Sequence, residues 1–140
     1  MRRLVFDSFA IMAWLYEEPG AGFVDTLLRD IHTGMAEGGM SIINVGEIYY
    51  RVARREGTLR AETTLLSLSE FNWTIYPASE AFVMAAARLK GRLPISYADA
   101  FALACAQERR AELVTRDPEI LNTDHGVPIL WPGVGPTPEE

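Results

Sequence analysis

Five short apolar runs alternate with helical patterns along this 140-residue chain, and this alternation restricts the fold more than any other feature. The runs predict strands at residues 3–6, 40–43, 73–76, 113–115 and 127–131. Helical spacing is present at residues 10–16, around 23–28, and at 44–56, 59–68, 80–90 and 96–110, and residues 33–39 form a predicted glycine-rich loop. Such alternation predicts an α/β fold, a three-layer α/β/α sandwich with a mostly parallel sheet of about five strands.

The length and composition fit one domain. An apolar content of 49% is enough to fill one hydrophobic core. We expect that domain to span residues 1–132, followed by a flexible Pro- and Gly-rich tail at 133–140. The single cysteine, Cys105, excludes an intrachain disulfide and indicates a reducing compartment. No apolar run approaches the roughly 18 residues of a membrane helix, so we expect a cytoplasmic protein with no membrane partner.

The net charge of −6 argues against a protein that holds nucleic acid mainly through counterion release, because that mode requires many Lys and Arg residues on phosphates. Solubility is the default explanation of a modest negative charge. Any nucleic acid must therefore be held weakly or through a metal ion.

Acidic residues follow three of the predicted strands. Asp7 comes directly after the first strand, Glu47 lies one helical turn after the second, and Asp117 follows the fourth by two residues. A fourth acid, Asp99, lies in the first turn of the last long predicted helix. Parallel sheets bind ligands outside the carboxyl ends of their strands, near the point where strand order reverses. We therefore expect these four carboxylates to converge at one edge of the sheet.

Helix capping is the alternative explanation of each acid, since acids are favoured at helix N-termini for reasons unrelated to catalysis. Four segments have the pattern of a helix start: 7–8, 44–47, 96–99 and 117–118. Capping explains the position of each acid separately, but it does not explain why four carboxylates should converge on one edge of the sheet. Two carboxylates about 5 Å apart repel by roughly 3 kcal/mol at an effective dielectric near 20, whereas a helix terminus contributes about 0.3–1 kcal/mol. A cation or a proton must intervene.

Oxygen ligands without cysteine or histidine select a hard cation, so the expected cofactor is Mg²⁺ or Mn²⁺ rather than zinc. The two histidines, His32 and His125, are expected on the surface. A cation in such a site can polarise a phosphate oxygen and lower the pKa of a bound water, which is the chemistry that phosphodiester hydrolysis needs. A one-metal and a two-metal mechanism both remain open.

At these residues the chain strongly resembles the PIN-domain nucleases, and within them the VapC-like toxins of bacterial and archaeal toxin–antitoxin pairs. The resemblance covers nearly the whole chain and is carried by residues 4–8, 17–20, 41–50, 94–100 and 113–118. Its specific part is the spacing of the acids. The resemblance implies metal-dependent endoribonuclease activity, homodimerisation, and inhibition by a small VapB-like antitoxin whose tail enters the acidic groove.

The family's pattern assigns metal binding and catalysis to the four acids, and it makes Ser8, Asn44 and Thr115 polar neighbours that orient ligands or phosphate. Capping or turn hydrogen bonding is the alternative for these three residues. The chain departs from the pattern at Phe9, where many relatives have a second small hydroxyl residue. This departure removes a hydroxyl contribution at position 9 and leaves the acids intact.

Basic residues near the acids are candidate RNA contacts, with a solvated helix face as the alternative. Arg51 follows Glu47 by one helical turn, which would place a guanidinium beside the metal. The candidates are Arg51, Arg54, Arg55, Lys90 and Arg92.

Other acidic sites on α/β folds fit the sequence less well. A phosphatase of the haloacid-dehalogenase type has a second aspartate two residues after the first, where this chain has Phe9. A receiver-type signalling domain has a lysine after its last strand, where Trp131 and Pro132 stand here. A catalytically silent PIN-like module that binds RNA or protein is the remaining alternative, and the complete set of acids argues against it.

Overall fold

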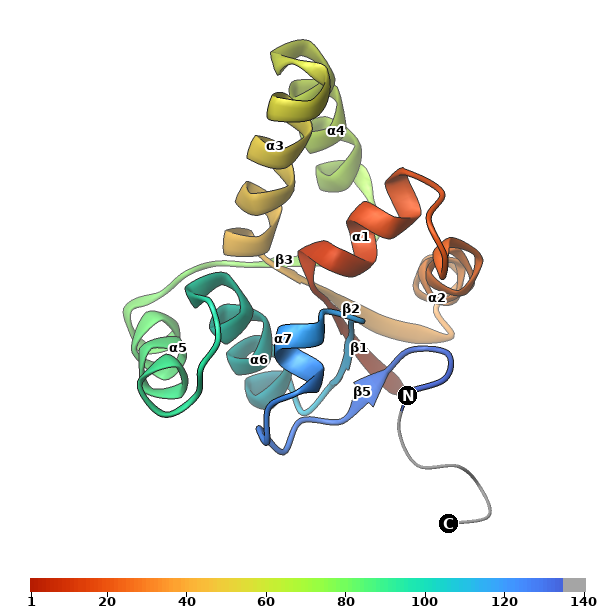
Figure 1. Cartoon of the computed structure of the whole chain (residues 1–140). Helices are drawn as coiled ribbons and strands as arrows, with labels where there is room; N and C mark the ends of the chain where they lie inside the picture. Colours follow the sequence, from red (N-terminus) through yellow and green to blue (C-terminus); the bar gives the residue numbers. More distant parts are fainter. Residues whose placement is uncertain (135–140) are drawn as a thin grey trace.

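The structure, a computed structural model, describes residues 1–134 and contains one parallel sheet (Figure 1). Its strands are β1 (Arg2–Phe6), β2 (Ala36–Ser41), β3 (Thr74–Tyr76), β4 (Glu112–Val114) and β5 (Ile129–Leu130). They lie in the order β3-β2-β1-β4-β5, and all neighbours are parallel. Strand order therefore reverses at β1, which pairs with β2 on one side and β4 on the other. The predicted α/β fold with a parallel sheet is confirmed.

Helices cover both faces of the sheet. One face carries α1 (Ser8–Leu15), α2 (Ala21–His32), α3 (Ile42–Glu56) and α4 (Thr58–Glu70). The other carries α5 (Glu80–Arg92), α6 (Tyr97–Arg109) and α7 (Pro118–Leu121). The antiparallel pair α3–α4 projects away from the sheet (Figure 1).

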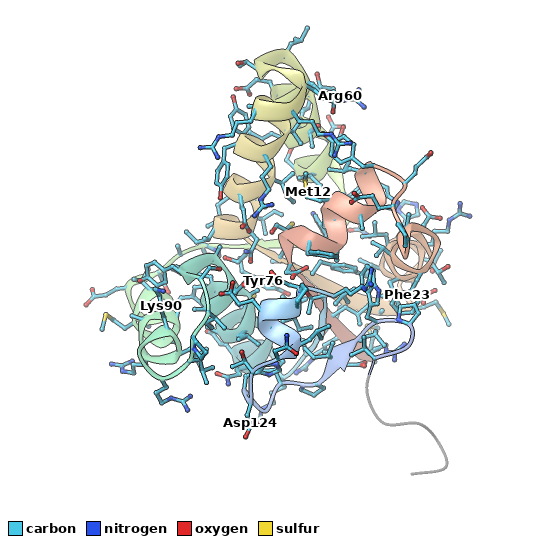
Figure 2. The ribbon with its side chains drawn as sticks, viewed as in Figure 1. Met12, Phe23, Arg60, Tyr76, Lys90 and Asp124 are labelled. Atoms are coloured by element: carbon cyan, nitrogen blue, oxygen red, sulfur yellow. The ribbon has the colours of Figure 1, made fainter. Side chains whose placement is uncertain are left out.

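Side-chain alternation along β1 divides the core between the two layers. Leu4 and Phe6 pack with α1 to α4, whereas Val5 packs with α5 and α6, and all three are fully buried. Side chains fill the space between the sheet and the helices, and Phe23 of α2 lies close to the end of the described chain (Figure 2). Its ring centroid is 6.1 Å from that of Trp131, which follows β5.

The predicted loop at 33–39 is wrong from Ala36 onward, because β2 occupies that stretch. Gly38 and Gly39 suggested a loop, but here they allow close strand packing. An added Cβ at Gly39 would overlap the carbonyl oxygen of Thr74, and one at Gly38 would overlap that of Leu4. These glycines are therefore required by the neighbouring strands of the sheet.

The predicted strand at 40–43 ends two residues earlier, and α3 begins at Ile42. Ser41 is the N-cap, because its Oγ accepts a hydrogen bond from the Ile43 amide at 3.2 Å. The capping box expected between Asn44 and Glu47 is therefore wrong, since Asn44 already lies inside the helix.

The remaining differences concern element ends. Helix α1 begins at Ser8 rather than residue 10, α5 continues through Gly91 to Arg92, and β5 is limited to Ile129–Leu130. The tail expected at 133–140 lies outside the described residues from position 135 onward. Within residues 1–134, every helix is too short or too polar to cross a membrane.

Candidate metal centre

Strand pairing brings Asp7 and the segment after β4 together. Phe6 is in register with Val114, and the Asp7 amide donates to the Val114 carbonyl at 3.3 Å. One residue further on, the buried Thr115 hydroxyl donates to Asp7 Oδ2 and accepts from the Asp117 amide at 2.9 Å. Thr115 thus connects two aspartates that are far apart in sequence.

Asp7 is a buried carboxylate with both oxygens engaged. Its Oδ1 accepts from the Ala10 amide at 2.9 Å and so caps α1, while Oδ2 accepts from Thr115. Burial raises the pKa of Asp7 from 3.8 to about 7, against the lowering effect of these hydrogen bonds. The charges of Asp117 and Glu47 raise the pKa further.

Asp99 faces the same point from α6. Ser96 caps this helix by accepting the Asp99 amide hydrogen bond at 3.1 Å, and the Asp99 side chain is buried. Burial, followed by the charge of Asp117 and a hydrogen bond with it, raises the pKa of Asp99 to about 8. Asp117 caps α7 by accepting from the Glu119 amide at 2.9 Å.

Asp7, Asp99 and Asp117 each offer a carboxylate oxygen, and these oxygens lie within 4.8 Å of one another. At that distance two charges repel by roughly 3.5 kcal/mol at an effective dielectric of 20. Burial is the main cause of the raised pKa values of Asp7 and Asp99, and the charges of the neighbouring acids raise both pKa values further. A cluster of hard oxygen donors that resists simultaneous ionisation fits a divalent cation of the Mg²⁺ or Mn²⁺ type.

Glu47, the fourth predicted acid, lies outside this group of three. Its Oε1 accepts from Ser8 Oγ at 2.5 Å and from Asn44 Nδ2 at 3.4 Å, while Oε2 accepts from Arg51 Nη2 at 3.2 Å. Its charge is near enough to raise the pKa of Asp7. The structure therefore brings three acids together and places the fourth beside them, paired with Arg51.

Asn44 connects Glu47 to the helix that carries Asp99. Its Nδ2 donates to the Ala98 carbonyl at 3.2 Å as well as to Glu47. Among the buried side-chain nitrogen and oxygen atoms of residues 1–134, its Oδ1 is the one that lacks a hydrogen-bond partner. A buried acceptor without a donor is costly, so this oxygen favours a bound water molecule or cation beside it.

Comparison with known proteins identifies the family. The family model described as the PIN domain matches residues 4–126. The chain belongs to the PIN-domain family. No curated protein matches this chain.

Solved structures share the fold at low sequence identity. Mycobacterium tuberculosis VapC20, described as a sarcin-ricin loop cleaving toxin, has a TM-score of 0.71 and 15% identity over 93% of this chain and 99% of that one. DNA-bound VapBC from Salmonella typhimurium has a TM-score of 0.71 and 14% identity over 93% and 98%. FitAcB from Neisseria gonorrhoeae has a TM-score of 0.63 and 22% identity over 90% and 95%.

The basic residues of this PIN domain differ in their contacts. Arg51 is the one of the five candidates that contacts a predicted site acid in the described structure. Arg54 lies over the Tyr50 ring at 4.9 Å, and Arg55 lies over the Tyr16 ring at 3.7 Å. Lys90 Nζ, on α5 (Figure 2), donates to the Ile95 carbonyl at 2.9 Å, and Arg92 is exposed at the end of α5.

Glu119 is a site neighbour that the sequence analysis missed. Its carboxylate accepts from the Ser96 amide, and its charge contributes to the raised pKa of Asp99. The sequence feature that could have identified Glu119 is its position two residues after Asp117, in the first turn of the short helix α7. Glu119 thus links the starts of α6 and α7.

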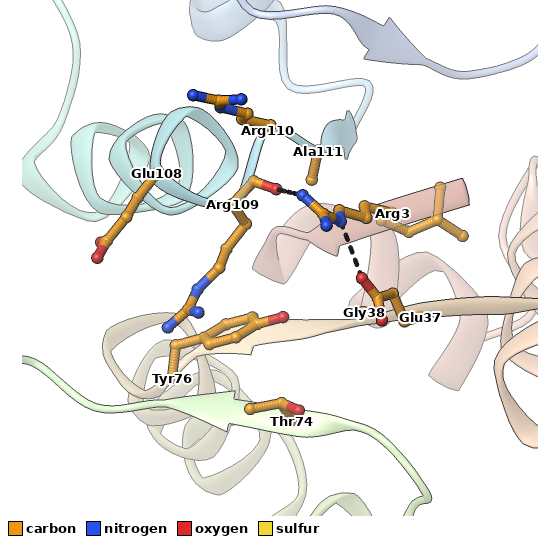
Figure 3. A pocket seen from close by; sticks show the side chains of 10 residues that line it. Arg3, Glu37, Gly38, Thr74, Tyr76, Glu108, Arg109, Arg110 and Ala111 are labelled. Carbon is orange, nitrogen blue, oxygen red and sulfur yellow. Dashed lines mark hydrogen bonds and ion pairs between the residues drawn. The ribbon is translucent and has the colours of Figure 1, made fainter. Parts of the chain in front are cut away.

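A hollow of about 480 Å³ lies at the opposite, amino-terminal end of the strands (Figure 3). Its charged side chains contact one another: Arg3 donates to Glu37 at 2.8 Å and to the Arg109 carbonyl at 3.3 Å. The Arg109 guanidinium lies 4.4 Å from the Tyr76 ring centroid. Arg3 and Arg109 of this hollow are thus engaged by the protein itself, and the acidic edge is the candidate functional site.

Proposed function

We propose that this PIN-domain protein is a Mg²⁺- or Mn²⁺-dependent endoribonuclease that hydrolyses RNA phosphodiester bonds. The observation that carries the proposal is the convergence of Asp7, Asp99 and Asp117, whose ligand oxygens lie within 4.8 Å of one another. Carboxylates at this spacing and burial suit a hard cation, and they lie at the carboxyl ends of parallel strands, where such folds bind ligands.

The three aspartates would hold the cation, and when bound it would polarise a phosphate oxygen and lower the pKa of a water molecule. The chain's own residues orient these ligands. Thr115 and the Ala10 amide fix the Asp7 carboxylate, and the Glu119 amide fixes that of Asp117. The Asn44 Oδ1 atom is an acceptor suited to a water molecule beside it.

Single-stranded RNA is the substrate class that the surroundings favour. Phe9 and Tyr97 are 37% and 43% exposed, and they lie two residues from Asp7 and Asp99 respectively. Exposed aromatic rings can stack on unpaired bases, which is how sequence-tolerant recognition of single strands is achieved. Arg51 adds a half-exposed guanidinium for phosphate.

We also propose that the protein acts in the cytoplasm as the toxin of a toxin–antitoxin pair, as a homodimer inhibited by a VapB-like antitoxin. Support comes from its structural neighbours, which include VapBC from Salmonella typhimurium and a toxin–antitoxin complex from Klebsiella pneumoniae at 21% identity and a TM-score of 0.61. An open reading frame for a small protein next to this gene would support the pairing.

Incubation of purified protein with total RNA tests the enzymatic proposal. Cleavage is expected with Mn²⁺ or Mg²⁺, none with EDTA, and none with Asp99→Asn in either metal. Sequencing of the 5′ ends of the fragments would identify the cleavage site. Full activity in excess chelator would exclude the metal mechanism, and RNA binding without cleavage in both metals would support the silent PIN-like module.

A further inference from the structure

Arg51 links the buried carboxylate of Glu47 to the protein surface. The Arg51 side chain is 54% exposed and that of Glu47 is 9% exposed. Arg51 Nη2 donates to Glu47 Oε2 at 3.2 Å, whereas Oε1 is held by Ser8 and Asn44. Among the residues that the structure describes, Arg51 is the one donor to Oε2, so this oxygen changes partner if the guanidinium moves.

A guanidinium and a divalent cation compete for the same oxygen. The cation must meet the lone pairs at which the Arg51 N–H group points, and the two positive charges repel at such short range. While Arg51 is bound to Oε2, Glu47 is withheld from the centre formed by Asp7, Asp99 and Asp117. This agrees with the position of Glu47 beside that group instead of within it.

An RNA phosphate offers the guanidinium a better partner. A phosphodiester accepts paired N–H bonds from arginine, whereas the contact with Glu47 uses a single nitrogen. The Arg51 side chain is 54% exposed, so a phosphate in solution can reach its guanidinium. Movement toward the phosphate would free Oε2 in the same step.

We propose that Arg51 is a latch on Glu47 that RNA opens: in the free protein it keeps Glu47 from the metal centre, and contact with a phosphate releases the carboxylate as a fourth metal ligand. The proposal rests on the metal-dependent function above. Arg51 is then a positioning residue that couples metal binding to RNA binding, and by linkage each raises the affinity for the other by the same factor.

Calorimetric titration of the full chain with Mn²⁺ tests the latch without relying on activity. The RNA substitute is a short phosphorothioate oligothymidylate, which carries backbone charge and resists hydrolysis. A methylphosphonate oligothymidylate, which is uncharged, is its control. For the wild type, the charged oligonucleotide should lower the Kd for Mn²⁺ by about 5-fold or more, within the usual range of coupling between sites. The uncharged one should have no effect.

Arg51→Gln should bind Mn²⁺ about 5-fold or more tightly than the wild type without oligonucleotide, and the charged oligonucleotide should no longer change its Kd. Arg60→Gln is the matched control, because it also removes a half-exposed arginine that pairs with a glutamate four residues earlier, Glu56, which lies outside the acidic edge. It should behave as the wild type does. Circular dichroism checks folding, and Arg51→Met replaces the glutamine variant if that variant does not fold.

A double-mutant cycle separates the latch from the general effect of a nearby charge. In a Glu47→Gln background, Arg51→Gln should leave the Kd for Mn²⁺ unchanged; an effect that persists there would show that Arg51 acts through space, which overturns the latch. Weaker Mn²⁺ binding by Arg51→Gln alone would also overturn it. If the wild type binds no Mn²⁺, the proposed function itself fails. Equal binding with and without the charged oligonucleotide rejects the latch alone.

Discussion

Asp7→Asn should stabilise the metal-free protein at alkaline pH, although it alters a residue of the proposed active site. The pKa of Asp7 is about 7 in the folded protein and 3.8 in the unfolded chain. Because the unfolded chain releases this proton more easily, the folded state loses stability as pH rises from about 4 to about 7. At 1.36 kcal/mol per pH unit, ionised Asp7 costs the folded protein about 4 kcal/mol at pH 8.

The substitution also removes one favourable contact. Asparagine can still cap α1 through Oδ1, but its amide cannot accept the Thr115 hydroxyl as Oδ2 does. Loss of that hydrogen bond costs about 1 kcal/mol, so the net gain at pH 8 is about 3 kcal/mol. This corresponds to a rise in Tm of about 10 °C for a chain of this size.

Urea unfolding in EDTA at pH 8 and pH 4 measures this effect. At pH 4 most of the ionisation cost is absent and the lost hydrogen bond outweighs the remainder, so the variant should then be no more stable than the wild type. Asp124→Asn is the control, because Asp124 is exposed, and it should change the free energy of unfolding by less than about 0.5 kcal/mol. A variant less stable than the wild type at both pH values would show that Asp7 is only a helix cap.

Three further predictions concern the same edge and the sheet beneath it. Asp99→Asn should melt higher than the wild type in EDTA yet lose most of the stabilisation that Mn²⁺ gives; a variant that melts lower but gains as much from Mn²⁺ would make Asp99 merely a capping partner of Ser96. Gly39→Ala should lower the free energy of unfolding by about 3 kcal/mol or more in urea, since its Cβ meets the Thr74 carbonyl oxygen, and an unchanged midpoint would contradict the close strand approach. Arg51→Ala should weaken RNA binding in filter assays at low salt with little change in Tm; unchanged binding there would indicate a solvated helix face.

The convergence of Asp7, Asp99 and Asp117 was predictable because topology alone imposes it. Parallel strands place their carboxyl ends at one edge, and a helix that packs antiparallel to them starts at the same edge. The pairing of β1 with β4 then made Asp7 and Asp117 neighbours. The alternation of strands and helices follows from the apolar pattern, whereas the strand order and the starts of α1 and α3 do not.

The position of Glu47 was not predictable in the same way. Whether a side chain inside a helix points at the site can be predicted only if the first residue of the helix and its rotation about its axis are both known. The predicted start of α3 was two residues too late. Ser41 ends β2 and caps α3 at once, so no loop residues marked the boundary. The spacing of Glu47 and Arg51 predicted that they lie close, but not that Arg51 would hold the carboxylate.

Gly38 and Gly39 belong to β2 although glycines in sequence are typical of a loop. Glycine is typical of loops because of its conformational freedom, and this pattern ordinarily outweighs a short apolar run. Here the glycines serve the close approach of neighbouring backbones, which is a tertiary requirement that no local pattern reveals.

Helix capping and metal binding are compatible at this edge. Asp7 and Asp117 are N-caps, and Asp99 lies in the first turn of α6, so three helix N-termini point their partial positive charges at the cluster. Each helix N-terminus stabilises a nearby negative charge by about 0.3–1 kcal/mol. The repulsion between two ionised carboxylates 4.8 Å apart is roughly 3.5 kcal/mol. Three pairs therefore cost about 10 kcal/mol, several times what the helices supply. The caps fix the geometry of the carboxylates, but only protons or a cation can balance their charge, so the proposed divalent cation would allow all three to ionise near neutral pH.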